Sequence, residues 1–237
     1  MATIGLDKLY YAEITEDENG NETYGTPKQL AKAINADLSI ELNEATLYAD
    51  DGQAEAVKEF KSGSLSLGVD DIGHEVAAAL VGATLDSNGV LISGSEDCSK
   101  YVAIGFRAKK ANGKYKYYWL YRVLFGVPAT NLATKGDSIS FQTPTIEGTL
   151  FRRNKLDGKA NHPWKAEVTE NATNAEVIKN WYKEVYEPNY ADTEGGSASK
   201  QSSGTDTPGE QTNATQGNTG SDSGNSDEQQ SSGGSGR

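Results

Sequence analysis

The chain has 237 residues and carries 34 acidic and 22 basic side chains, which give a formal net charge of −12. It contains one cysteine, so an internal disulfide is impossible, and its apolar runs are too short to cross a bilayer. The first residues lack both the basic and the apolar segment of a secretory signal. Together these features argue against a membrane protein, a disulfide-stapled secreted module and a strongly basic nucleic-acid-binding protein.

Alternation of apolar and polar side chains predicts strands in the first 70 residues. The first strand covers Leu6–Ile14 and ends in the turn-rich run Asp17–Glu22. Residues 38–42 and 65–69 alternate in the same way. Between them, Asn43–Gly63 has few apolar residues and is predicted to be a long polar connection, which is unusual inside a compact domain.

A short helix is expected next, capped by Asp71, running to Leu80 and ending at Gly82. A β-hairpin follows around Asn112-Gly113, a dipeptide that favours a two-residue type I′ turn. That turn pairs Ala111 with Lys114. In this register one face of the hairpin is continuously apolar and aromatic, from Val102 opposite Val123 to Ala108 opposite Tyr117.

The remaining ordered elements are two strands and a helix. Residues 139–143 alternate up to Pro144, and residues 146–150 resume the alternation. Thr173 and Glu176 form a capping box before a stripe of Val177, Trp181 and Val185, which ends before Pro188. The sum is a mainly antiparallel β domain with a short helix and a C-terminal helix.

The composition changes sharply after Tyr190. Residues 191–237 include 10 glycines and no aromatic residue, too little apolar surface to offset the entropy of ordering, so this segment is predicted to be a disordered tail. The ordered domain is therefore expected to cover residues 1–190. Its first 100 residues carry a net charge of −13 and residues 101–190 carry +6, which suits head-to-tail association if the charges lie on separate faces.

The sequence predicts no catalytic residue, metal ligand or cofactor site. Its two histidines, His74 and His162, are far apart, and Ala78 stands where a zinc-protease helix needs a second histidine. The pairs Asp50-Asp51 and Asp70-Asp71 are better explained by a turn and a helix cap than by acid–base chemistry. Cys98 has no partner cysteine and no basic neighbour before it, which argues against a redox role.

One segment mixes bases with aromatic residues, RAKKANGKYKYYWLYR at Arg107–Arg122. It could grip single-stranded nucleic acid by stacking and by charge. The alternative, which the acidic balance of the chain favours, is a β-ribbon whose aromatic residues face the core and whose lysines solvate the turn.

Three stretches carry a resemblance to a known family. They are MATIGLDKLYYAEITEDENGNETYGTPKQLAKA, NEATLYADDGQAEAVKEFKSGSLSLGVDDIG and YVAIGFRAKKANGKYKYYWLYRVLFGVPATNLATKGDSISFQTPTIEGTLF. Over the 190 ordered residues the chain resembles the major tail proteins, or tail tube proteins, of siphophages, viruses with long non-contractile tails. Some members carry an immunoglobulin-like domain after the tube domain, where this chain has only its Gly/Ser/Asn-rich tail.

The resemblance implies a β-sandwich or partly closed β-barrel with a flanking helix. It also implies a virion protein, made in the host cytoplasm, whose copies form hexameric rings stacked into a tube. The expected partners are other copies of the chain, the tape-measure protein and other tail proteins, and double-stranded DNA that passes through the lumen without tight binding.

Two sets of residues follow as hypotheses. Glu41 and Glu44 are expected to contribute negative charge to the lumen, which would repel DNA phosphates. The polar connection is expected to project, to be mobile in the monomer and to become ordered against a neighbouring ring, pairing its acids with bases of the neighbour. The acids are Asp50, Asp51, Glu55 and Glu59, and the bases are Lys109, Lys110 and Arg152.

Alternatives are an ordinary surface hairpin for this segment and, for the whole chain, a monomeric β-sandwich that binds carbohydrate or a cell surface. A hydrolase is the third candidate, but its clustered titratable residues are missing from the sequence.

Overall fold

The computed structural model describes residues 2–18, 20–49, 52–130, 132–134 and 141–190. Strands dominate these residues, and the two α-helices are short. In chain order the elements are β1 (Thr3–Glu16), β2 (Glu22–Tyr24), β3 (Lys28–Ala31), β4 (Ala33–Ala49), β5 (Gly52–Val69), α1 (His74–Val81), β6 (Thr84–Leu85), β7 (Leu91–Ile92), β8 (Tyr101–Lys110), β9 (Tyr115–Phe125), β10 (Thr145–Phe151), β11 (Lys165–Thr169) and α2 (Ala175–Asn180).

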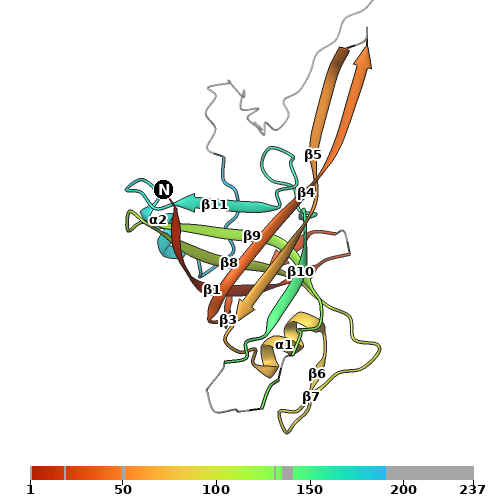
Figure 1. Cartoon of the computed structure of the whole chain (residues 1–237), viewed down its shortest axis with the longest axis vertical. Helices are drawn as coiled ribbons and strands as arrows, with labels where there is room; N and C mark the ends of the chain where they lie inside the picture. Colours follow the sequence, from red (N-terminus) through yellow and green to blue (C-terminus); the bar gives the residue numbers. More distant parts are fainter. Residues whose placement is uncertain (1, 19, 50–51, 131, 135–140, 191–237) are drawn as a thin grey trace, which may run out of the picture. The chain divides into compact units, whose positions relative to one another are not determined.

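One antiparallel sheet organises the molecule. Its strand order is β2-β1-β8-β9-β10-β5-β4, with β3 added beside β1 and β11 beside β9, while β6 and β7 form a separate hairpin. Figure 1 shows β4 and β5 crossing β1, β8 and β9 at a steep angle. This confirms the mainly antiparallel β fold with short helices. The sheet is not closed, because no hydrogen-bonded ladder joins β4 to β1 among the described residues, so the expectation of partial closure was too strong.

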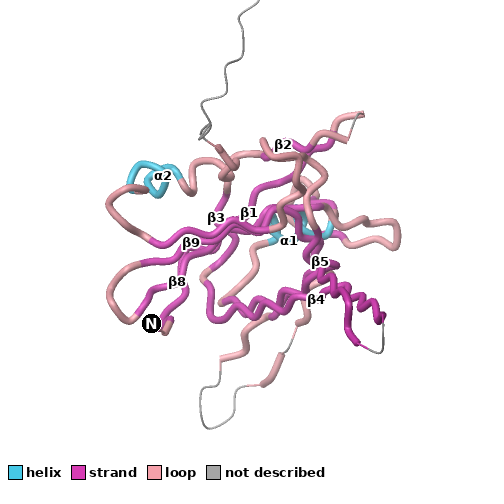
Figure 2. The backbone as a smooth tube through the Cα atoms, turned by 90° about the horizontal axis from the view of Figure 1, so that it is seen from above, coloured by secondary structure: helices cyan, strands magenta, loops and turns pink. Residues whose placement is uncertain are grey.

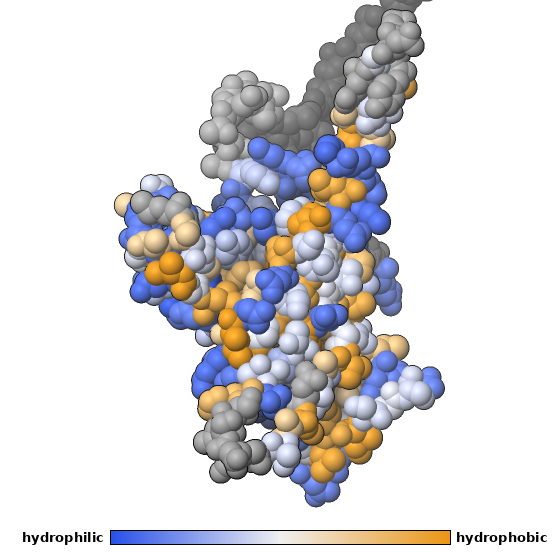
Figure 3. Space-filling view, in the orientation of Figure 1, coloured by the Kyte–Doolittle hydropathy of each residue, from blue (hydrophilic) through white to orange (hydrophobic). Residues whose placement is uncertain are grey.

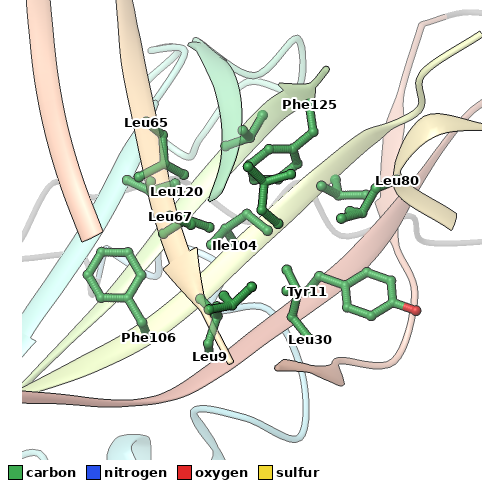
Figure 4. Close-up of a cluster of buried hydrophobic side chains, with 14 of the residues drawn as sticks. Leu9, Tyr11, Leu30, Leu65, Leu67, Leu80, Ile104, Phe106, Leu120 and Phe125 are labelled. Carbon is green, nitrogen blue, oxygen red and sulfur yellow. The ribbon is translucent and has the colours of Figure 1, made fainter. Parts of the chain in front are cut away.

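Apolar side chains form a cluster on each face of the β8–β9 ribbon. The larger cluster lies between the two halves of the sheet and under α1, and Figure 4 shows part of it, including Leu65, Leu67, Ile104 and Leu120. The second cluster is covered by the segment after β11. Its buried members are Ala12, Ala103, Tyr117, Trp119, Tyr121, Trp181 and Val185. Both faces of the central ribbon are therefore buried, which explains its nearly continuous apolar sequence.

The predicted hairpin register is right at one end and wrong at the other. Tyr101 pairs with Leu124 and Val102 with Val123, as expected, but a bulge follows and the pairing then shifts by one residue, so that Phe106 faces Tyr118. The shift arises at the turn. The Lys110 N–H donates to the Lys114 carbonyl oxygen and only Gly113 has positive φ, so the loop has three residues instead of two. Tyr118 and Leu120 thus face the larger cluster.

Both helices differ from their predictions. The first begins at His74 with Gly73 as its cap, because the Asp71 carboxylate accepts a hydrogen bond from the adjacent Ile72 N–H and does not reach the helix. It ends at Gly82 as expected, with a left-handed φ of 75°. The second covers only Ala175–Asn180 and lacks a capping box, because Asn171 Oδ1 accepts the N–H groups of Thr173 and Asn174. Trp181 and Val185 are buried beyond its end.

The predicted polar connection at Asn43–Gly63 is a β-hairpin. Strands β4 and β5 run on through it, with pairing from Ala33 opposite Val69 to Ala49 opposite Gly52. The strands predicted at 6–14, 38–42, 65–69 and 146–150 lie within β1, β4, β5 and β10. Residues 141–143 are not in a strand, and residues 139–140 and the predicted tail at 191–237 lie outside the described residues.

Candidate functional site

The outer half of the β4–β5 hairpin projects from the rest of the domain (Figure 1). Pairing of β5 with a third strand ends where Gly63 faces Leu150 of β10. At that point Phe60 stacks on Trp164, with ring centroids 4.8 Å apart and an interplanar angle of 6°. Beyond it, the described residues 42–49 and 52–59 pair only within the hairpin. We call residues 42–60 the projecting hairpin; its projection agrees with the expectation from the sequence.

The projecting hairpin exposes apolar side chains on both faces. Leu42, Leu47 and Val57 are 47%, 59% and 46% exposed. Val57 lies opposite Ala45 and Leu47 lies opposite Glu55, so Val57 and Leu47 share one face, while Leu42 lies on the other. Two strands without a supporting surface are marginally stable in water, and exposed apolar side chains favour contact with another surface.

Glu41 and Glu44 lie on opposite faces of β4, because side chains alternate along a strand. Glu41 Oε2 lies 3.2 Å from Lys61 Nζ and also accepts a hydrogen bond from the Ser62 hydroxyl, and the Lys61 contact lowers the pKa of this carboxyl below its ordinary value. Glu44 Oε1 lies 2.7 Å from Lys58 Nζ. The two residues therefore cannot line one sheet face together.

The other charged residues predicted for contact are divided among several places. Glu55 and Glu59 are exposed on β5, while Asp50 and Asp51 lie outside the described residues. Lys109 and Lys110 lie at the turn end of β8, opposite Gly5 and Thr3 of β1. The remaining base, Arg152, directly follows β10 and is exposed. Among the described residues, Glu55 and Glu59 form no ion pair with Lys109, Lys110 or Arg152, so pairing of these two acids with these bases would involve a second copy.

One polar face of the sheet brings together carboxylates that were not predicted as site residues from the sequence. Asp37 and Ser66 are opposite each other, and Ser66 also faces Glu147 of β10. Glu41 is on the same face as Asp37, four residues along β4. A shallow groove of about 630 Å³ follows this face, and its polar lining consists of Asp37, Ser39, Ser64, Ser66, Glu147 and Thr149. Alternation with Leu38 and Ile146 is the sequence signal that could have located Asp37 and Glu147.

The gap between β1 and β4 is apolar. It contains a groove of about 490 Å³ whose lining includes Ile4, Leu6, Ile34, Phe106 and Tyr118. Ile4 and Ile34 are well exposed. Because β4 is the last strand of the sheet order, its outer edge has no strand partner among the described residues. Such an edge is able to pair with another chain.

The titratable residues discussed for catalysis have structural surroundings. His74 Nδ1 lies 3.3 Å from the Gly89 carbonyl oxygen and His162 Nδ1 lies 3.0 Å from that of Arg153. Asp70 Oδ1 accepts the Lys32 N–H, which lowers the pKa of that carboxyl. Among the described residues, no three His, Cys, Asp or Glu side chains gather as a metal site would require. No helix within the described part of the chain has the length and apolar character needed to cross a membrane.

Three of the five aromatic residues of Arg107–Arg122 are buried and therefore not available for stacking on bases, while Tyr115 and Tyr118 are partly exposed. Tyr117, Trp119 and Tyr121 are buried under the C-terminal segment, where the Trp119 indole N–H donates to the Trp181 carbonyl oxygen at 3.0 Å and the Tyr121 hydroxyl to that of Tyr186 at 2.8 Å. This arrangement matches the interpretation of the segment as a β-ribbon with a solvated turn.

No protein-family model matches the chain, and no curated protein matches it.

Proposed function

We propose that this chain is a structural virion protein whose copies assemble into rings, hexameric as in the tail tube proteins it resembles, and that the rings stack into the tail tube of a long-tailed phage. The tube would be filled first by the tape-measure protein and would later conduct double-stranded DNA. In this proposal the assembled tube carries out the function, and no single copy catalyses a reaction.

The observation that carries the proposal is the projecting hairpin. Its outer residues pair only with each other, yet it exposes Leu42, Leu47 and Val57. Burial contributes roughly 25 cal/mol for each Å² of apolar surface removed from water, so covering these side chains on a neighbouring copy would favour assembly. The open edge of β4 offers a second means of joining copies, by strand pairing.

The polar face of β4, β5 and β10 is suited to the lumen. Asp37 and Glu147 supply negative charge there, as does Glu41, whose charge the ion pair with Lys61 partly offsets. The hydroxyl groups between them keep the face hydrated. Carboxylates repel DNA phosphates and would leave water and counterions between wall and duplex. Glu44 lies on the opposite face, paired with Lys58, so under this proposal Glu41 contributes lumen charge and Glu44 does not.

Electron microscopy of the purified full chain at high concentration tests the function. Rings or tubes are expected, whereas dispersed monomers with affinity for glycans would support the carbohydrate-binding alternative. A three-dimensional map of the tubes would place Glu41; a map with Glu41 on the outer surface would reject the lumen assignment.

A variant with a shortened hairpin tests whether the projecting hairpin is needed for assembly. In this variant a two-residue Asn-Gly turn replaces residues 46–56 and connects Ala45 to Val57. These two residues are opposite each other in the hairpin, so the remaining pairs keep their register. The variant is expected to remain a folded monomer, as judged by circular dichroism and sedimentation, and to form no tubes. Normal tubes from this variant would contradict the role of the hairpin.

A milder test replaces two exposed side chains, Leu47→Ser with Val57→Ser, and uses Val177→Ser on α2 as a control of similar exposure. All variants should unfold as the unmodified chain does, because none of these side chains is buried. Only the double variant should raise the concentration at which tubes appear.

A further inference from the structure

The α1 end of the domain contains an apolar pocket with an acidic rim. The pocket has a volume of about 370 Å³ and lies between α1 and the β9–β10 connection. Its apolar lining includes Ile72, Val81, Leu91, Val127 and Leu132. Val127 is 82% exposed at the border of this pocket. Figure 3 shows hydrophobic surface at the end of the domain that carries β6 and β7.

The rim of this pocket is negatively charged. Asp70 and Asp71 line it. The ion pair of Lys32 with Asp70, at 3.6 Å, offsets part of the charge. A partner that fills the pocket should therefore combine an apolar side chain with positive charge.

The opposite end of the domain carries a loop with this chemistry. Residues 152–161 follow β10, which starts at Thr145 beside Gly68 and ends at Phe151 beside Arg122, so this loop and the α1 end lie at opposite ends of the strand. Figure 2 shows the domain from above, with α1 near the middle of the view. The loop exposes Leu156 to 51%. Its solvent-facing cations are Arg152, Lys155 and Lys159, of which Lys155 pairs with Glu187, while Arg153 is buried and also pairs with Glu187. Asp157 is the carboxylate of the loop itself.

Hydrogen bonds within the protomer fix the conformation of this loop without a binding partner. Asp157 Oδ1 accepts the N–H groups of Lys159 and Asn161, at 2.9 Å and 2.8 Å. The fully buried Glu22 carboxylate accepts the Asn154 N–H at 2.9 Å while also pairing with Arg122. A rigid loop loses little conformational entropy on binding, which favours its use as a docking element.

We propose that the loop at residues 152–161 of one copy docks on the α1-end pocket of the next, with Leu156 in the apolar hollow and Arg152 and Lys159 facing the acidic rim. Because the two surfaces lie at opposite ends of one domain, the contact is head-to-tail and continues along a stack. The proposal rests on the tail tube function and names one contact between successive rings. The projecting hairpin is a poorer occupant of the pocket, because Glu55 and Glu59 would repel the acidic rim.

Site-directed crosslinking tests this contact in the full chain. In a Cys98→Ser background, Leu156→Cys and Val127→Cys are made as separate proteins, each with one exposed thiol. Mixing them under mild oxidation should give a disulfide-linked heterodimer, seen on a non-reducing gel, and neither protein alone should give as much dimer. Lys114→Cys, exposed at the β8–β9 turn, replaces Val127→Cys in the matched control and should crosslink weakly.

The outcomes separate this inference from the proposed function. Tubes seen by electron microscopy, without preferential Leu156→Cys to Val127→Cys crosslinking, would overturn the contact and leave the tube function standing. Absence of both tubes and crosslinks would overturn both. A charge test adds a second readout: Arg152→Glu should weaken assembly, and Asp71→Arg in the same chain should restore it if the two side chains meet.

Discussion

Glu187 holds the C-terminal segment against the sheet through Arg153. Glu187 Oε2 accepts a hydrogen bond from Arg153 Nη1 at 2.8 Å, and Glu187 Oε1 accepts one from Lys155 Nζ at 3.0 Å. The Arg153 side chain is fully buried, with its guanidinium 4.7 Å from the centre of the Tyr121 ring. A half-exposed carboxylate thus neutralises a buried cation and anchors the segment that covers the second apolar cluster.

Replacing this carboxylate should destabilise the domain. Glu187→Gln leaves the buried Arg153 charge without its counter-ion, and we expect the free energy of unfolding to fall by about 2 kcal/mol, the scale of a hydrogen bond to a charged group. Urea denaturation of the full chain measures it. Glu184→Gln, an exposed neighbour, serves as the control and should change stability little; equal effects of the two substitutions would refute the anchoring role.

The C-terminal stripe divides into one exposed and two buried side chains. Val177 is 39% exposed, whereas Trp181 is 2% exposed and its carbonyl accepts the Trp119 indole N–H. Trp181→Ala should lower the free energy of unfolding by about 3–5 kcal/mol, as large-to-small core substitutions do. Val177→Ala should change it by less than about 0.5 kcal/mol. Similar losses for both would indicate a longer helix in which the whole stripe is buried.

Gly82 combines positive φ with a close contact. Its φ is 75°, and a Cβ at this position would clash with the Cys98 carbonyl oxygen. Gly89 has a similar φ of 79° but open space around it. Gly89→Ala should therefore lose only the backbone preference, about 1 kcal/mol, and Gly82→Ala should lose clearly more, measured by thermal unfolding. Equal losses of stability in the two variants would mean that the backbone around Cys98 can shift to accommodate the new Cβ without loss of free energy.

The hydroxyl of Tyr190 sets the acidity of Asp157. It donates a hydrogen bond to Asp157 Oδ2 at 2.6 Å and, with the N–H groups of Asn161 and Lys159, lowers the pKa of Asp157 from 3.8 to about 2. A depressed pKa stabilises the folded state above pH 3.8, and this contribution is lost as the pH falls toward 2. Tyr190→Phe should raise the pKa of Asp157, measured by NMR titration of its carboxyl carbon. An unchanged pKa in this variant would show that the loop amides alone account for the shift.

Several elements could be predicted because local sequence is sufficient for them. Alternation locates the strands around Leu38, Leu67 and Ile146, since a strand presents every second side chain to one face. The Asn112-Gly113 pair locates a hairpin, and Gly82 a helix end, because left-handed backbone favours glycine. The excess of acid in the first 100 residues also follows directly from counting.

Other features depend on contacts between residues distant in the chain. Because of a three-residue loop and a bulge in β9, Tyr118 and Leu120 face the larger cluster. The segment around Trp181 covers the other face of the ribbon. The polar run at Asn43–Gly63 continues as paired strands because each half supplies the hydrogen-bonding groups that the other lacks. Local sequence thus located most of the strands and turns, while the tertiary structure decided how far β4 and β5 extend and which face each side chain occupies. Burial and register depend on the combined free energy of many long-range contacts, which no short segment contains.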